Sequence, residues 1–195
     1  MAADPPEADP QAAKTDTRTM GPRLLRIVPA VSPIELDRAL LLLARTRGHA
    51  RWLERAVGAY SRTGEHAACW LALGVAGATV ARDAERRQAW LRGVRIVASA
   101  YAINYAVKVT VRRRRPELAG LPPLTPTVSA LSFPSAHATT SFAAARAYGR
   151  AVPAAPLYLA AVAFALSRPY LGVHYPADVL AGAGLGTAVA GAWPR

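Results

Sequence analysis

The stretch Ser167-Arg168-Pro169-Tyr170-Leu171-Gly172-Val173-His174-Tyr175-Pro176-Ala177-Asp178 joins two apolar segments and carries an arginine, a histidine and an aspartate. Two more polar links lie upstream, Lys108 through Arg115-Pro116 and Pro134-Ser135-Ala136-His137. Each lies beside an apolar stretch of the length that membrane helices use. The pattern predicts one site, assembled from the ends of several helices at one membrane face.

Composition supports a membrane protein of one compact domain. Of 195 residues, 52% are hydrophobic, and 24 Lys+Arg against 12 Asp+Glu give a net charge of +12. The charges gather between long uncharged runs, which favours contact with anionic lipid and phosphate over nucleic acid. The single Cys69 excludes an internal disulfide and a Cys-based metal site, and we interpret it as a small buried hydrophobe.

The apolar runs predict an all-α fold, a polytopic transmembrane bundle of about five spanning helices. A charged link at 82–92, with Trp90 as an interfacial anchor, is predicted between the first two helices. The spacing Gly182-x-x-x-Gly186 predicts close packing of the last helix. The five helices are expected at 67–81, 94–111, 136–148, 156–167 and 176–193.

The N-terminal part is expected to differ from the bundle. Residues 1–22 lack large apolar side chains and are predicted to be a disordered tail. Residues 23–65 are predicted to form an amphipathic interfacial helix region, in which Ser32 and Glu35 make a capping box and arginines face lipid headgroups. The alternative is a cytosolic helix packed on the bundle. The domain proper is expected at 66–195.

The first polar link offers cations for an anion. Pro116 disfavours helix at Arg115, so the chain should leave the helix there and let Lys108 and Arg115 converge. A guanidinium offers paired donors that suit phosphate oxygens. The neighbouring run 112–114 is interpreted as an anchor at anionic headgroups.

The second link is predicted to begin a helix. Ser135 is the expected N-cap, and the free N–H groups that follow it form an anion site. His137 in the first turn can donate a proton near neutral pH. Taken alone, a capping serine followed by a histidine is commonplace and does not indicate catalysis.

The third link supplies a histidine and an acid. If the Asp178 carboxylate accepts the Nδ1–H of His174, Nε2 is free to act as nucleophile or base. Singly, Asp178 could be a first-turn helix charge and His174 a surface residue. Together, the three links hold the groups needed for phosphoryl transfer. They hold no carboxylate cluster for magnesium, so neither metal nor cofactor is expected.

These three links resemble the signature motifs of the type 2 phosphatidic acid phosphatase superfamily, which includes bacterial acid phosphatases and vanadium haloperoxidases. The resemblance covers residues 108–178 by motif and about 67–193 by helix layout. The chain departs from the family at Ala136, where the second motif usually has glycine. The added methyl group is expected beside the phosphate, where it can restrict substrate or rate.

The resemblance implies a metal-free mechanism in the membrane phosphatase domain, 66–195. His174 would attack phosphorus and form a phosphohistidine, oriented by Asp178, while His137 would protonate the leaving group and then assist water. The phosphate would be held by Lys108, Arg115, Ser135, Arg168 and the amide of Ala136.

The function expected from the sequence is that of a multi-pass plasma-membrane lipid phosphatase, with lipid phosphate and membrane lipids as its partners and no nucleic acid. The chain resembles actinobacterial members of the family that act on polyprenyl-linked phosphates such as decaprenylphosphoryl-phosphoribose. Phosphatidate, phosphatidylglycerophosphate and undecaprenyl pyrophosphate are alternative substrates. A different class of function is a non-catalytic protein that binds anionic lipid. The family favours an extracytoplasmic site, whereas the basic N-terminal region favours a cytoplasmic one.

Overall fold

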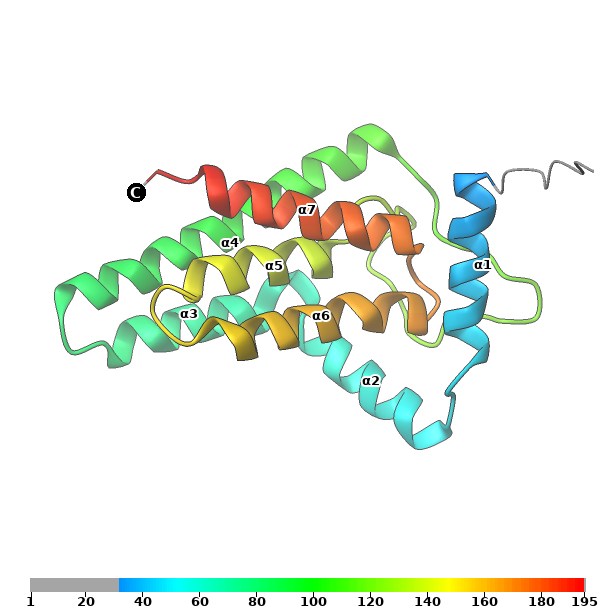
Figure 1. Cartoon of the computed structure of the whole chain (residues 1–195), viewed down its shortest axis with the longest axis horizontal. Coiled ribbons are helices and arrows are strands. Elements are labelled where there is room, and N and C mark those ends of the chain that lie inside the picture. Colours follow the sequence, from blue (N-terminus) through cyan, green and yellow to red (C-terminus); the bar gives the residue numbers. More distant parts are fainter. Residues whose placement is uncertain (1–31, 195) are drawn as a thin grey trace, which may run out of the picture. The chain divides into compact units, whose positions relative to one another are not determined.

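The computed structural model describes residues 32–194, and this part of the chain is an all-α bundle, as predicted (Figure 1). The predicted tail at 1–22 lies outside the described residues. The helices are α1 (Pro33–Thr46), α2 (Arg51–Thr63), α3 (Ala68–Val80), α4 (Ala84–Val111), α5 (Ala136–Tyr148), α6 (Ala154–Tyr170) and α7 (Pro176–Ala192), with a 3-10 turn, η1, at Glu65–Ala67.

Helix α5 lies at the centre of the bundle and packs against α4, α6 and α7 (Figure 1). Its alanines suit this place, because small side chains let several helices approach one axis. Ala143, Ala144 and Ala145 are fully buried, and so is Tyr148, whose hydroxyl donates to the carbonyl of Trp70 at 3.0 Å. The three polar links therefore start or end on helices that meet α5.

The predicted close packing at Gly182 and Gly186 is confirmed. A Cβ atom on Gly182 would lie 2.5 Å from the carbonyl oxygen of Ser135, and one on Gly186 would overlap the carbonyl of Thr139. Helix α7 thus touches the backbone of α5 directly. This contact brings the first turn of α7 beside the first turn of α5.

The N-terminal region, predicted as an amphipathic helix weakened near Gly48, forms two separate helices, α1 and α2. Gly48 has a φ of +70°, a conformation that glycine adopts easily, and the chain turns there between α1 and α2. The capping box is confirmed, since Glu35 N donates to Ser32 Oγ at 3.2 Å and Ser32 N donates to Glu35 Oε2 at 2.8 Å. Helix α1 packs against α6 and α7 and crosses the bundle at the end that holds their connection (Figure 1).

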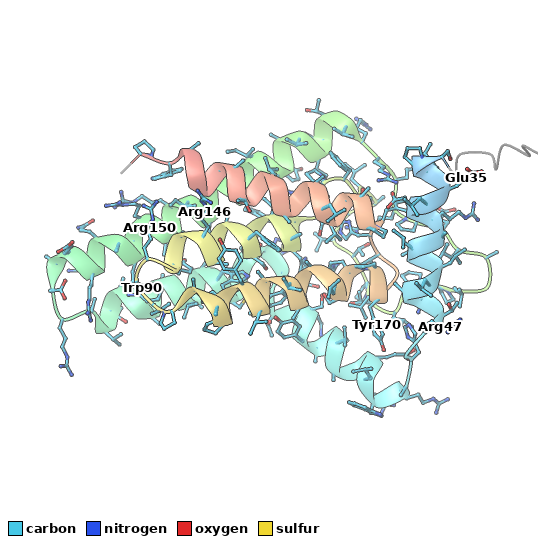
Figure 2. All side chains as sticks on the ribbon, viewed as in Figure 1. Glu35, Arg47, Trp90, Arg146, Arg150 and Tyr170 are labelled. Carbon is cyan, nitrogen blue, oxygen red and sulfur yellow. The ribbon has the colours of Figure 1, made fainter. Side chains whose placement is uncertain are left out.

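The predicted charged link at 82–92 is wrong for most of its length. Asp83 caps α4 by accepting from Arg86 N at 2.8 Å, and the helix continues without a break to Val111. Its Glu, Arg, Gln and Ala residues are good helix formers. Trp90 is only 8% exposed and packs on Tyr148 at 5.1 Å between ring centroids (Figure 2). It is a core residue and not an interfacial anchor.

No helix among residues 32–194 has both the length and the hydropathy that a membrane span requires. Helices α3 and α5 have 13 residues each, and the first half of the 28-residue α4 carries arginines. Cys69 is half-buried rather than fully buried.

Candidate active site

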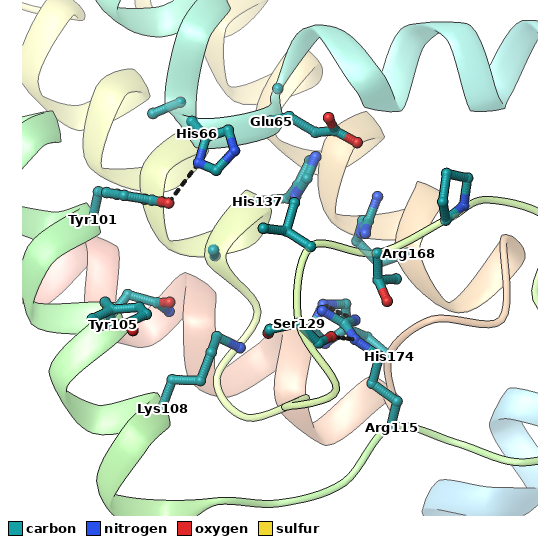
Figure 3. A pocket seen from close by; sticks show the side chains of 17 residues that line it. Glu65, His66, Tyr101, Tyr105, Lys108, Arg115, Ser129, His137, Arg168 and His174 are labelled. Carbon is teal, nitrogen blue, oxygen red and sulfur yellow. Dashed lines mark hydrogen bonds between the residues drawn. The ribbon is translucent and has the colours of Figure 1, made fainter.

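The three polar links meet in one pocket at the end of the bundle (Figure 3). Its other walls are the turn 64–67, one face of α4 and the loop 126–129. Six of the eight site residues predicted from sequence line this pocket: Lys108, Arg115, Ala136, His137, Arg168 and His174. The other two, Ser135 and Asp178, are fully buried and do not line it.

Arg115 holds the predicted nucleophile. Its Nη1 atom lies 3.0 Å from Nε2 of His174 and donates to the carbonyl of Val173 at 2.7 Å, while its Nε donates to the carbonyl of Ser129 at 2.7 Å. Because a guanidinium can only donate, Nε2 is an acceptor and the hydrogen of the neutral imidazole is on Nδ1. Nε2 therefore directs its lone pair toward the cation that would bind phosphate.

Burial sets the charge of both groups. It lowers the pKa of His174 to about 3, against the opposing effect of Asp178 and with a further lowering by Arg115. Burial also lowers the pKa of Arg115 to about 10, and the negative charge of Asp178 counteracts it. At neutral pH the site therefore combines an uncharged imidazole with a guanidinium cation.

Ser132 stands between His174 and Asp178. The Nδ1 atom of His174 is 3.3 Å from Ser132 Oγ and 3.6 Å from Asp178 Oδ2, and the Ser132 hydroxyl donates to Oδ2. The second distance is longer than a hydrogen bond. The orienting contact expected between the histidine and the acid is thus shared with a buried hydroxyl, which the sequence motifs did not identify.

Arg113 binds the other oxygen of Asp178. Its Nη1 donates to Asp178 Oδ1 at 2.8 Å, its Nη2 donates to Asp37 Oδ2 on α1 at 2.8 Å, and its guanidinium lies 4.1 Å from the ring centre of Tyr175. Asp37 Oδ1 in turn accepts from Ala177 N at 2.8 Å. Burial lowers the pKa of Arg113, but the two carboxylates outweigh it and the net shift is upward.

The interpretation of Arg113 as a headgroup anchor is therefore wrong. Arg112 ends α4 with a φ of +55° and turns the chain back, so that the next side chain points into the protein. Arg112 and Arg114 are exposed, as the anchor role requires. The alternation follows from the extended backbone after the helix, which turns neighbouring side chains to opposite sides.

Lys108 contacts backbone rather than an acid. Its Nζ donates to the carbonyls of Leu131, Ser132 and Pro134 at 3.3, 3.2 and 2.9 Å. Lys108 thus fixes the segment that brings Ser132 to the acid. Ser135 follows this segment as the N-cap of α5, as predicted, with its hydroxyl accepting from Ala138 N at 3.5 Å.

Ser61 of α2 holds the opposite wall. His137 Nε2 donates to the carbonyl of Ser61 at 2.9 Å, and Nη1 of Arg168 donates to the Ser61 hydroxyl. The buried Nε of Arg168 has no partner among the described residues. Ser61 was missed from sequence because no motif includes it, and it reaches the site only through the fold of α2.

The pocket is chemically an anion site. Arg115, Arg168 and Lys108 provide three cations around a neutral imidazole, and residues 32–194 contain no group of three His, Cys, Asp or Glu side chains placed to hold a metal ion. Such a set can bind a phosphoryl group and present a nitrogen nucleophile to it.

Comparisons with known proteins agree with this chemistry. The sequence pattern of the PAP2 superfamily matches residues 89–195. The decaprenylphosphoryl-5-phosphoribose phosphatase of Mycobacterium tuberculosis is 45% identical over 130 residues, which cover 66% of this chain and 72% of that protein. Among solved structures, Aquifex aeolicus LpxE superposes with a TM-score of 0.69 and 21% identity, over 80% of this chain and 92% of that one.

A transmembrane PAP2-type phosphatidylglycerolphosphate phosphatase from Bacillus subtilis superposes with a TM-score of 0.63 and 24% identity, over 80% of this chain and 81% of that one. At these identities the two solved structures show a shared fold. The motif match and the mycobacterial relative go further, and with the His174 pocket they show that this chain belongs to the PAP2 superfamily as one of its phosphatases.

Proposed function

We propose that the chain hydrolyses the 5-phosphate of a polyprenylphosphoryl-phosphoribose, with decaprenylphosphoryl-5-phosphoribose as its substrate. The observation that carries the chemistry is the 3.0 Å contact between Arg115 and Nε2 of His174 in a pocket that also holds Arg168. Support for the substrate comes from the mycobacterial phosphatase of that name, which is 45% identical to this chain.

The first step forms a covalent intermediate. The phosphoryl group binds Arg115 and Arg168 and draws Arg115 away from Nε2, whose lone pair then attacks phosphorus. The bond from phosphorus to the ribose 5-oxygen breaks, and that oxygen takes a proton from His137. A bound phosphate dianion favours the protonated imidazolium that this step requires. Ser132 and Asp178 stabilise the positive charge that His174 gains.

The second step releases phosphate. A water molecule takes the place of the ribose hydroxyl and attacks the phosphohistidine, while His137 accepts its proton. The bond between phosphorus and Nε2 breaks and inorganic phosphate leaves. Lys108 and the Ala136 amide complete the proposed phosphate site, and Lys108 also holds the 131–134 segment in place. Ser135 is buried behind the pocket and caps the helix that presents this amide.

We further propose that the bundle lies in the plasma membrane. Large apolar side chains on its outer helices are exposed, and soluble proteins rarely expose such groups together. Helix α1 and Trp52 of α2, which is 71% exposed, would lie at the membrane surface. The exposed bundle residues include Leu73, Val75, Val80, Ile103, Val109, Leu159, Val162, Leu166 and Leu180.

Phosphate release from a lipid panel tests the proposed function. The full chain, purified in detergent, is assayed with decaprenylphosphoryl-5-phosphoribose, phosphatidate, phosphatidylglycerophosphate and undecaprenyl pyrophosphate, with and without excess EDTA. We expect the highest kcat/KM for the phosphoribose lipid, unaffected by EDTA. His174→Ala should lower the rate by roughly three orders of magnitude or more. His49→Ala, a histidine outside the pocket, is the matched control. Preference for another lipid, or a need for added metal, would contradict the proposal.

A further inference from the structure

The turn 64–67 forms a wall of the pocket that the catalytic steps do not use. His66 and Ala67 have φ values of +52° and +61°, in the left-handed region that side chains disfavour. Strained backbone of this kind persists where the surrounding structure enforces it, and it gathers at ligand sites. The turn places Glu65 and His66 on the pocket wall.

The position of the turn relates it to the leaving group. In-line displacement puts the leaving oxygen opposite the attacking Nε2 of His174, beside the proton donor His137. Gly64 abuts that donor, since a Cβ on Gly64 would lie 3.0 Å from Cδ2 of His137. Figure 3 shows Glu65 and His66 on the side of His137 away from Arg115 and His174. Glu65 and His66 therefore face the alcohol that leaves and not the phosphoryl oxygens.

The chemistry of the turn does not suit a phosphate. Glu65 is half-buried, and within residues 32–194 no cation lies within 4 Å of its carboxylate. A carboxylate repels a nearby phosphate, but it accepts strong hydrogen bonds from hydroxyl groups. His66 Nδ1 is 2.8 Å from the Tyr101 hydroxyl, and the other ring nitrogen, Nε2, has no hydrogen-bond partner among residues 32–194. The Glu65 carboxylate and the His66 imidazole can therefore form hydrogen bonds with neighbouring hydroxyl groups of a ligand.

We propose that Glu65 and His66 bind the 2- and 3-hydroxyls of the ribose that carries the scissile phosphate. This inference rests on the proposed function, because the subsite would recognise the ribose of the proposed substrate. Tyr101 positions the His66 ring. Binding the sugar here aligns the 5-oxygen with His137 and favours a phosphoribose over lipid phosphates that lack a vicinal diol.

The test compares two substrates that differ only in these hydroxyls. The probes are farnesylphosphoryl-5-phosphoribose and its 2,3-dideoxyribose analogue, assayed with the full-length enzyme. We expect the native enzyme to favour the ribose probe by more than about tenfold, because the dideoxy probe loses both hydrogen bonds and the one to the charged Glu65 is alone worth about that factor. Glu65→Gln should lower kcat/KM for the ribose probe about tenfold and leave that for the dideoxy probe within about twofold. His66→Ala should act in the same direction.

Glu85→Gln, an exposed carboxylate at the far end of α4, is the matched control and should leave both rates unchanged. Thermal melting of each variant reports whether the fold is kept. Equal losses on both probes, or no preference in the native enzyme, would overturn the sugar subsite alone. Hydrolysis of phosphatidate with no activity on either sugar probe would overturn the proposed function itself.

Discussion

Arg113 decides how the acid of the site is held. Asp178 is fully buried, and Arg113 neutralises it while joining it to Asp37 of the N-terminal helix. A buried carboxylate that loses its charged partner rises in free energy and moves to find another. Arg113 therefore acts through Asp178 on the orientation of His174, without contacting the pocket.

Replacing Arg113 tests this role. Arg113→Lys keeps the charge but cannot bridge two carboxylates in one plane, so kcat should fall roughly ten- to hundredfold with little change in KM. Arg114→Lys, the exposed neighbour, should behave as the native enzyme. Steady-state kinetics with the phosphoribose lipid check both. A lowered melting temperature with kcat unchanged would make Arg113 merely structural.

His174 links stability to pH. Its pKa is about 3 in the folded protein and about 6.5 in the unfolded chain, so below pH 6.5 the unfolded state binds the proton more readily. The stability that neutral His174 contributes is complete above pH 6.5 and is lost as the pH falls toward 3. Melting temperatures between pH 7.5 and 4.5 should therefore fall more steeply for the native protein than for His174→Asn. Parallel curves would mean that His174 already carries the proton when folded.

At the scale of helices, the contact between α5 and α7 positions the second and third links. Gly182 lets α7 touch the carbonyl of Ser135, and Ser135 N donates to the carbonyl of Asp178 at 2.9 Å. The first turns of the two helices are thus joined backbone to backbone. Because α7 has glycine and no larger side chain at this contact, its backbone fixes the distance between His137 and Asp178.

Adding one methyl group should disturb that contact. Gly182→Ala would place a carbon 2.5 Å from the Ser135 carbonyl, so the helices must separate, and overpacking of this kind costs about 1–3 kcal/mol. Gly184→Ala meets open space on the same helix and should instead stabilise it by about 0.5–1 kcal/mol. Thermal melting and phosphate release measure both changes. Equal melting temperatures for the two variants would refute the close approach.

At the scale of the whole molecule, local sequence signals predicted where helices begin, whereas contacts between residues far apart in the sequence could not be predicted. Ser135 and Pro176 mark the starts of α5 and α7, and both helices begin where these residues predict. Trp90 was misplaced, because charges around it fit a loop as well as the exposed side of a helix. Ser61, Ser132 and Arg113 could not be found from spacing, since each joins partners more than 40 residues away that only the folded bundle brings together.

The central claim is that His174 carries the phosphoryl group during turnover, and trapping that intermediate tests it most directly. Decaprenylphosphoryl-5-phosphoribose labelled with ³²P at the 5-phosphate is mixed with the full-length enzyme, quenched in alkali, which preserves phosphohistidine, and mapped by peptide mass spectrometry. The account predicts label on His174 within the first turnover, and none in His174→Ala, whose phosphate release should be slower by roughly three orders of magnitude or more. Label on another residue, or phosphate release by His174→Ala at a rate near that of the native enzyme, would contradict it.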